Sequence, residues 1–577
     1  MLSKINNIKN WHAALIIATT GFATFFTGLK NPFMSDDLAQ IVNNPLVHSI
    51  TNIHSFFAGS TFYNVTGSPL IGTFYRPLMT TVFSILYTIF GPHTFYFHFL
   101  QITLYILSAF MVFLVLKYFF KPALAIFLSL IFLVHPINSQ VAFAIPSMQE
   151  ELFFLFGILA IWSLLRFDSV KSLIFAALCL FLSLLSKETA VVFIVVALLY
   201  LFWFNRKRLL PFIGIMVVPV ASYLLLRLSA VGFMGHANNA PIDNLGIWQR
   251  IVTMPAIVFF YIYHFIFPFK LARAYYWVHP TFSVRYVLLP LIIDVIILGL
   301  IVYAAKILYK KLPKDQFLIF AFFVAWMVIG LLIHLQIIPL DATTSETWFY
   351  FPMIGLLGMI GVVLAIFIPR INPTLLIIIG CLLIGSLAFR TALRGHDYRD
   401  AYTIQTIDIA VSKESYSAYN NLSIDYMAQG KIKEAKDYAA RSVSIFPTYA
   451  GYDNLATAST ELGDYVGAMQ AYKELLVYNK NDSSLYEKIG EITLFTGDYQ
   501  SDKKFLTDAT NTFPKDATLW MYLAILEDGN GDKANAKTSI LKAANFGQIS
   551  QQLYDSIMLG KPFTIKFGDI GKTVAVK

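Results

Sequence analysis

The sequence of 577 residues is poor in charge and in cysteine. Asp, Glu, Lys and Arg make up 13% of it, whereas an ordinary soluble domain contains about 25%. The two cysteines, Cys179 and Cys381, lie inside apolar runs and cannot build a disulfide framework or a thiolate metal site. The chain also lacks a GxxxxGKS phosphate-binding loop, which argues against a nucleotide-sugar donor held by such a loop.

Charge is missing mainly from the first two thirds of the chain. Apolar runs follow one another from Trp11 to about Ala392, and from Arg394 onward the sequence is polar. About 20 apolar residues suffice to cross the hydrocarbon core of a membrane. The sequence therefore predicts an integral membrane protein, with a transmembrane domain over residues 1–393 and a polar part after it.

Eleven apolar stretches are candidates for membrane spans, and two more, 76–91 and 249–268, are ambiguous. The eleven are 11–29, 95–119, 122–137, 150–166, 169–186, 188–204, 209–230, 285–307, 316–338, 347–368 and 371–392. Counting both ambiguous stretches as spans gives 13. Either count places the N-terminus in the cytoplasm and the C-terminus outside.

Basic residues in the short loops separate the two counts, because cytoplasmic loops carry an excess of Lys and Arg. With 11 spans, three basic clusters lie inside: Lys117 with Lys121, Arg166 with Lys171, and Arg206 to Arg208. With 13 spans, the same clusters lie outside. We therefore predict 11 spans, with both ambiguous stretches as interfacial or re-entrant helices. Such loops carry much of the net charge of +9, so we expect no nucleic-acid partner.

The polar C-terminal part contains an internal repeat. Gly430, Gly463, Gly497 and Gly531 recur at spacings of 33, 34 and 34 residues, the period of a helix–turn–helix repeat. An aromatic residue stands eleven positions before each glycine: Tyr419, Tyr452, Tyr486 and Trp520. The pattern resembles four tetratricopeptide repeats over 416–550, with a linker at 394–415 and a C-terminal tail at 551–577. Such arrays usually bind a peptide or a protein, although the repeats could also be a spacer.

Two adjacent carboxylates, Asp36 and Asp37, open the first outside loop, which we place at 30–94. One interpretation is structural, with Ser35 or Asp36 as the N-cap of a short interfacial helix. The other interpretation is chemical. A carboxylate at the membrane surface can act as a general base toward a hydroxyl, or the pair can hold a divalent cation. The sequence alone leaves these interpretations open.

Several further motifs follow in order along the chain. They are Asn43-Asn44, Tyr75-Arg76-Pro77-Leu78, His135-Pro136-Ile137, Glu150, Lys187-Glu188, and Glu346 with Tyr350 and Pro352. With Asp36-Asp37 and the repeats, this ordered set resembles the GT-C glycosyltransferases, and most closely the transmembrane and tetratricopeptide repeat-containing O-mannosyltransferase family. The sequence departs from that family at Gln140, near Met148 and at Thr347, where the family usually has Glu, Arg and Arg.

The resemblance implies both a fold and a reaction. The fold is all-α, a polytopic GT-C-type transmembrane helical bundle followed by a tetratricopeptide-repeat α-solenoid. The reaction is inverting transfer of a hexose, mannose by analogy, from a polyprenyl-phosphate carrier to an extracytoplasmic hydroxyl. By the same analogy the acceptor is protein Ser or Thr, recruited by the repeats. Two alternatives stay open: a polysaccharide or lipid acceptor, and a scaffold that assembles partners without catalysis. We expect a bacterial plasma membrane as the location.

The same resemblance gives the polar residues candidate roles. Asp36 is the expected base, with Asp37 as the alternative, and any divalent cation would bind to this pair. Arg76 is the best candidate for the donor phosphate, because a guanidinium matches phosphate oxygens. Lys187 is the second candidate, unless it pairs with its neighbour in the sequence. Candidate contacts of the acceptor or the sugar are His135, Glu150, Glu188 and Glu346, and His135 could instead cap a helix.

Overall fold

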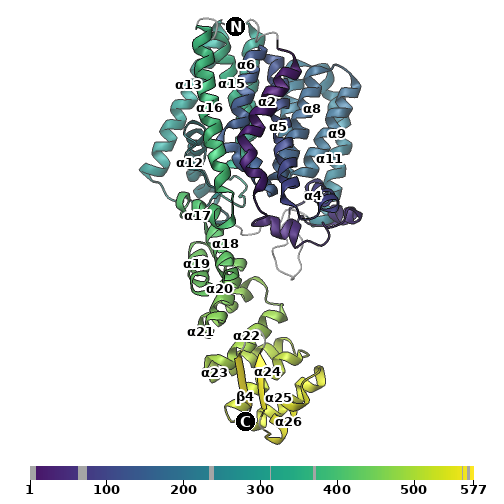
Figure 1. Ribbon diagram of the computed structural model, residues 1–577, viewed down its shortest axis with the longest axis vertical. Coiled ribbons are helices and arrows are strands. Elements are labelled where there is room, and N and C mark those ends of the chain that lie inside the picture. The colour runs from purple at the N-terminus through teal and green to yellow at the C-terminus, as the bar shows by residue number, and fades with distance from the viewer. Residues whose placement is uncertain are drawn as a thin grey trace. The chain divides into compact units, whose positions relative to one another are not determined.

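The computed structural model describes residues 8–62, 74–232, 240–311, 313–367, 372–561, 563–567 and 572–576. Over these ranges nearly all regular structure is helical, and four strands form two antiparallel two-stranded sheets. The chain divides into two compact units, Met1–Ser415 and Tyr416–Lys577 (Figure 1). The predicted all-α fold is therefore confirmed.

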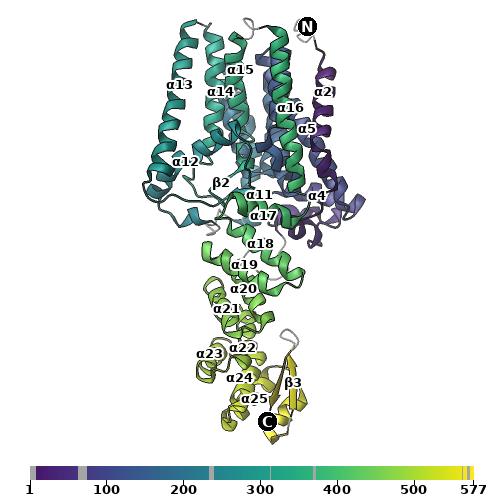
Figure 2. The same cartoon turned by 60° about the vertical axis from the view of Figure 1, so that its left-hand side comes forward.

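The first unit is a bundle of long apolar helices, most of which run side by side (Figure 2). They are α2 (Asn10–Phe25), α5 (Thr94–Phe119), α6 (Pro122–Val134), α8 (Met148–Arg166), α9 (Val170–Ser186), α10 (Val191–Phe204), α11 (Leu209–Val231), α12 (Ile247–Ile266), α13 (Leu289–Lys311), α14 (Lys314–Leu332), α15 (Pro352–Phe367) and α16 (Pro373–Asp397). Each of the eleven predicted spans overlaps one of these helices. The remaining helix is α12.

Helix length separates the two stretches that were ambiguous in the sequence. In the described ranges seven helices are long and apolar enough to cross a membrane, or eight if the bent pair around His135 is one span. α12 is one of the seven, so its length and composition do not support the interfacial assignment of 249–268. α4 (Pro77–Phe90) has 14 residues, too few for a straight span, and fits the interfacial assignment of 76–91.

Aromatic rings fill the centre of the first unit. Tyr350, just before α15, packs against Phe132 of α6 and Phe154 of α8, at centroid distances of 5.0 and 4.3 Å. The Tyr105 hydroxyl of α5 donates a hydrogen bond to the Leu133 carbonyl at 2.9 Å. Aromatic pairs contribute about 0.5–1.5 kcal/mol each beyond the area that they bury. These contacts therefore fix the segment before α15 against two helices, α6 and α8, that lie far from it in the sequence, and they join α5 to α6.

Residues 394–415 are not the linker that the sequence suggested. They comprise the end of α16 and the helix α17 (Ala401–Val411), and both belong to the first unit. Asp400 caps α17 by accepting a hydrogen bond from the Thr403 backbone N–H at 2.7 Å. Gln405 and Asp408 of this helix are buried. The polar composition that resembled a linker belongs to a helix that buries part of its polar face.

The second unit consists of helices at the period of the repeat glycines. They are α18 (Tyr416–Ala428), α19 (Ile432–Ile445), α20 (Tyr449–Leu462), α21 (Tyr465–Tyr478), α22 (Ser483–Thr496), α23 (Tyr499–Thr512), α24 (Ala517–Gly529) and α25 (Lys533–Phe546). The four glycines have φ angles between 73° and 84°, which glycine adopts without steric cost. The expected tail forms α26 (Gln551–Leu559) and a hairpin of β3 (Phe563–Phe567) with β4 (Lys572–Val576).

A substitution at Gly355 tests how closely α15 packs on α14. A Cβ at Gly355 would lie 2.4 Å from the Met327 backbone nitrogen. We expect Gly355→Ala to lower the free energy of unfolding by about 1–3 kcal/mol, because two helix backbones would have to separate. Gly385→Ala in α16 is the matched control, since no atom lies within 4 Å of its Cβ. Thermal unfolding in detergent measures both, and equal melting temperatures would contradict this packing.

Candidate functional site

The turn that carries Asp36 and Asp37 lies between η1 (Phe26–Lys30) and η2 (Leu38–Val42). The buried Asp37 carboxylate accepts a hydrogen bond from the Met34 backbone N–H at 3.0 Å and closes the turn. Asp36 is exposed. The structure thus distinguishes two carboxylates that the sequence could not, because Asp37 stabilises the turn and Asp36 is open to a reactant.

The surroundings of both carboxyl groups favour the protonated form. Burial raises the pKa of Asp37 well above its usual range, and the neighbouring Asp36 adds to the rise. The protein around Asp36 raises its pKa as well, although the residue is exposed, while Arg273 and Arg76 oppose the rise. A carboxylate with a raised pKa is a stronger base than an ordinary one. Asp36 is therefore suited to accept a proton from a hydroxyl.

Arg76 is the N-cap residue of α4 and is buried. Its Nη2 lies 3.5 Å from Glu188 Oε1, and its guanidinium carbon lies 4.3 Å from the centroid of the Phe74 ring. Its Nε is buried and has no hydrogen-bond partner among the described residues. A buried donor without an acceptor is costly, so this N–H group is available to an oxyanion.

Lys187 follows α9, and its ammonium forms an ion pair with Glu150 at the start of α8. Both side chains are buried. The sequence offered Glu188 as the partner of Lys187, but Glu188 pairs with Arg76 instead. The reason is the extended backbone at Lys187, with φ −159° and ψ 137°, which directs consecutive side chains to opposite sides. Glu150 and Glu188 are thus counter-ions of the two cations.

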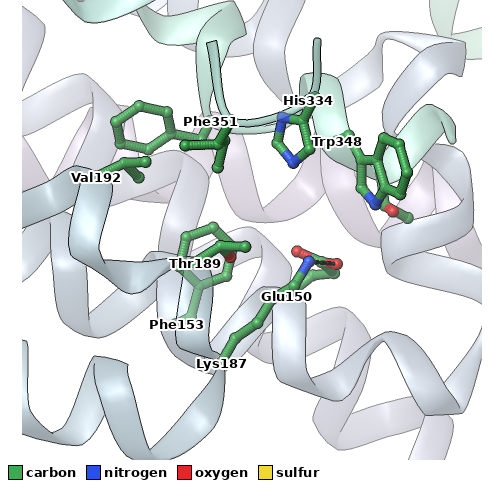
Figure 3. A pocket seen from close by; sticks show the side chains of 10 residues that line it. Glu150, Phe153, Lys187, Thr189, Val192, His334, Trp348 and Phe351 are labelled. Carbon is green, nitrogen blue, oxygen red and sulfur yellow. Dashed lines mark hydrogen bonds and ion pairs between the residues drawn. The ribbon is translucent and has the colours of Figure 1, made fainter. Parts of the chain in front are cut away.

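A small pocket adjoins the ion pair of Lys187 and Glu150 (Figure 3). His334 and Trp348 line its opposite side. Their rings stack at a centroid distance of 4.9 Å. The hydroxyl of Thr189 also lines this cavity, whose volume of about 10 Å³ has room for little more than a water molecule.

Asp341 is a site residue that the sequence analysis missed. It is exposed in the loop before β2 (Thr344–Ser345), which pairs with β1 (Ala274–Tyr275). The surrounding protein raises the pKa of Asp341, while Arg76 and Lys187 oppose the rise. Asp341 also raises the pKa of Asp36, so it lies within electrostatic reach of the carboxylate and of both cations. Its only signal in the sequence was an isolated acid in a short outside loop.

These groups come from one end of the first unit. Figure 2 shows α4, β2 and α17 toward the same end of the bundle, although they lie far apart in the sequence. Segments that are remote in the sequence thus meet at this end of the first unit.

His135 and Glu346, which the sequence offered as contacts of the acceptor or the sugar, are engaged in contacts within the protein itself. The Nδ1 atom of His135 accepts a hydrogen bond from the Ile137 N–H at 3.2 Å, and its Nε2 lies 2.9 Å from the Phe265 carbonyl oxygen. Both ring nitrogens are thus engaged, which favours the capping interpretation over an acceptor contact. Glu346 is fully buried and lies 3.7 Å from Nη2 of the equally buried Arg394. Its position inside the unit does not favour contact with a sugar.

The described residues contain no group of three or more His, Cys, Asp or Glu side chains that could hold a metal ion. The pair of Asp36 and Asp37 is therefore not part of such a ligand set in this portion of the chain.

Glu346 makes the stability of the protein depend on pH. Burial raises its pKa from the usual 4.5 to about 8. Between these values the folded protein retains a proton that the unfolded chain releases, so stability falls as pH rises. We expect Glu346→Gln to flatten this loss in thermal unfolding between pH 4.5 and pH 8. Glu461→Gln, at an exposed site, is the control, and identical pH profiles for wild type and Glu346→Gln would refute the prediction.

Comparison with known proteins gives two kinds of match. A family model described as tetratricopeptide repeat matches residues 417–446. The protein O-mannosyl-transferase TMTC1 of Mus musculus is 30% identical over 208 residues, which are 33% of this chain and 22% of that protein. The human TMTC1 is 30% identical over 217 residues, which are 34% of this chain and 24% of that protein. The match thus spans less than a quarter of the length of either relative.

Solved structures match with low similarity. YrrB, a TPR protein with an unusual peptide-binding site, is 16% identical, with 26% of this chain and 79% of that chain covered and a TM-score of 0.24. Yeast Tom70 is 13% identical, with 77% and 91% covered and a TM-score of 0.21. Neither TM-score indicates a shared overall fold. The sequence matches confirm the resemblance: about a third of the chain is similar to the TMTC1 protein O-mannosyl-transferases, and residues 417–446 match the tetratricopeptide repeat.

Proposed function

We propose that this protein is an integral membrane glycosyltransferase of the GT-C type. It transfers a hexose, mannose by analogy with its relatives, from a polyprenyl-phosphate carrier to a Ser or Thr hydroxyl of an extracytoplasmic protein. The observation that carries the proposal is the combination of an exposed carboxylate, Asp36, with two buried cations, Arg76 and Lys187, in one electrostatic group. The similarity to the TMTC1 O-mannosyl-transferases supports the reaction class.

The two cations are suited to the phosphate of the donor. A phosphate leaving group gains negative charge as its bond to the sugar breaks, and fixed cations in a buried site stabilise that charge. Arg76 has a buried Nε without a partner in the described part of the chain, and its contact with Glu188 is long at 3.5 Å. A phosphate oxygen can therefore accept a hydrogen bond from Arg76 while the ion pair of Lys187 and Glu150 stays in place.

Asp36 is suited to activate the acceptor. The acceptor hydroxyl gives its proton to the Asp36 carboxylate while its oxygen forms the new bond to the anomeric carbon of the sugar. The bond from that carbon to the phosphate oxygen breaks in the same step, and the electron pair stays on the phosphate. A single displacement of this kind inverts the anomeric carbon. Asp37 supports the step indirectly, because its carboxylate closes the turn that carries Asp36.

Asp36 and Asp37 variants test these roles. We expect Asp36→Asn to lower sugar transfer by about 100-fold or more, since a general base typically contributes about 10²–10⁴-fold. Asp37→Asn should have a smaller effect and should also lower the melting temperature, because it weakens the closure of the turn. Transfer from a radiolabelled polyprenyl-phosphate mannose in membranes measures both variants. Asp168→Asn, whose side chain is 80% exposed in another loop, is the control; full activity of Asp36→Asn would rule out the proposed base.

The repeats are the proposed docking site of the acceptor protein. We expect a chain that ends at Ser415, where the first compact unit ends, to glycosylate a short Ser/Thr peptide but not the native acceptor protein. The comparison of the two acceptors is the measurement, and it separates recruitment from catalysis. Unimpaired use of the native acceptor by the shortened chain would contradict the role of the repeats. Loss of transfer to both acceptors would likewise argue against a role in recruitment alone.

A further inference from the structure

Arg273 connects three parts of the first unit that are remote in the sequence. It stands directly before β1, and its Nε donates a hydrogen bond to Asp408 Oδ2 of α17 at 2.7 Å. Its Nη2 donates to Gln405 Oε1 at 2.6 Å, and its Nη1 lies 3.4 Å from Ser35 Oγ. Each of the three guanidinium nitrogens therefore has its own partner; a planar fork presents these donors from three atoms in fixed directions, whereas an ammonium offers its donors from a single nitrogen.

Helix α17 adds a second contact to the same serine. The Gln405 amide donates a hydrogen bond to Ser35 Oγ at 3.1 Å. Gln405 is fully buried and Asp408 is 3% exposed. The Arg273 backbone N–H also donates to Asp408 Oδ1 at 3.0 Å, so Asp408 fixes both the backbone and the side chain of the arginine. We call Arg273, Gln405 and Asp408 the α17 cluster.

Ser35 has an unusual backbone conformation. Its φ is 52°, and only Ser35 and Gln336 among the described non-glycine residues have a positive φ. Such a conformation persists in a non-glycine residue only where its surroundings maintain it. The α17 cluster supplies that support through the Ser35 hydroxyl. Because Asp36 is the next residue, the conformation of Ser35 determines the direction in which the Asp36 carboxylate points.

We propose that the α17 cluster positions Asp36 for proton transfer, which makes α17 a working part of the active site. This inference rests on the proposed function, because it assumes that Asp36 is the base. Arg273, Gln405 and Asp408 are positioning residues, since they act through Ser35 and not on the substrate. The charge of Arg273 has a second effect, because it opposes the rise in the pKa of Asp36. The other charged groups that influence Asp36 are Arg76 and Asp341, with Asp37 adjacent to it in the turn.

Two substitutions test whether the α17 cluster positions Asp36 or only holds α17 in place. Arg273→Lys keeps the positive charge but removes the three-way fork, and Gln405→Met removes one acceptor and one donor at nearly constant volume. We expect each variant to lower kcat about 10- to 100-fold with little change in the KM for the donor, as misplacement of a reacting group does. Arg399→Lys is the matched control, because its ion pair with Asp400 at the start of α17 is exposed.

Hydrogen exchange at the turn gives a readout that does not require activity. The Asp37 and Leu38 backbone N–H groups donate to Met34 and Ser35 carbonyl oxygens, each at 3.1 Å. We expect faster exchange of these two amides in Arg273→Lys and Gln405→Met, and wild-type exchange in Arg399→Lys. If one variant fails to fold, the other still tests the cluster.

The outcomes distinguish the two proposals. Faster exchange together with a lower kcat supports the positioning role. Wild-type exchange, or an unchanged kcat in folded variants while Asp36→Asn is inactive, overturns it. If the wild-type protein transfers no sugar, the proposed function fails, and the exchange rates alone then decide whether the cluster fixes the turn.

Discussion

The structure of the first unit depends on the pairing of a few buried charges. Removing one partner of a buried ion pair costs about 3–5 kcal/mol, so each buried cation requires an acid from another segment. Arg76 at the start of α4 pairs with Glu188 after α9, and Lys187 pairs with Glu150 at the start of α8. These two pairs connect the ends of helices that are far apart in the sequence. Arg76 also lies within electrostatic reach of Asp36.

The sequence was sufficient for features that depend on local composition. Apolar runs located the helices of the first unit, because a membrane-length helix needs only a long apolar stretch. The glycine period located the repeats, because each glycine adopts a positive φ that other residues avoid. Motif order also singled out Arg76 and Lys187, and both side chains are buried. Each of these inferences needed only residues that are close together in the chain or a period along it.

Features that depend on distant contacts were not predictable. The sequence offered Glu188 as the alternative partner of Lys187, but the extended backbone turns the two side chains apart. Residues 394–415 were predicted to be a linker because a helix with buried polar side chains can have the same composition as a solvent-exposed linker. Asp341 and Arg273 had no signal beyond an isolated charge, since their significance comes from partners more than a hundred residues away. His135 and Glu346 matched family motifs, but their partners in the fold are structural.

The proposed mechanism requires a phosphate that binds beside an exposed carboxylate. Binding of a polyprenyl phosphate without its sugar tests this point most directly, because it requires no turnover and no acceptor. The measurement is the Kd of the lipid for wild type, Arg76→Gln and Asp36→Asn in nanodiscs. We predict saturable binding to wild type, weakening by about tenfold or more in Arg76→Gln, because charge-assisted hydrogen bonds contribute about 1.5–3 kcal/mol, and near wild-type binding in Asp36→Asn. Equal affinity of wild type and Arg76→Gln would contradict the account.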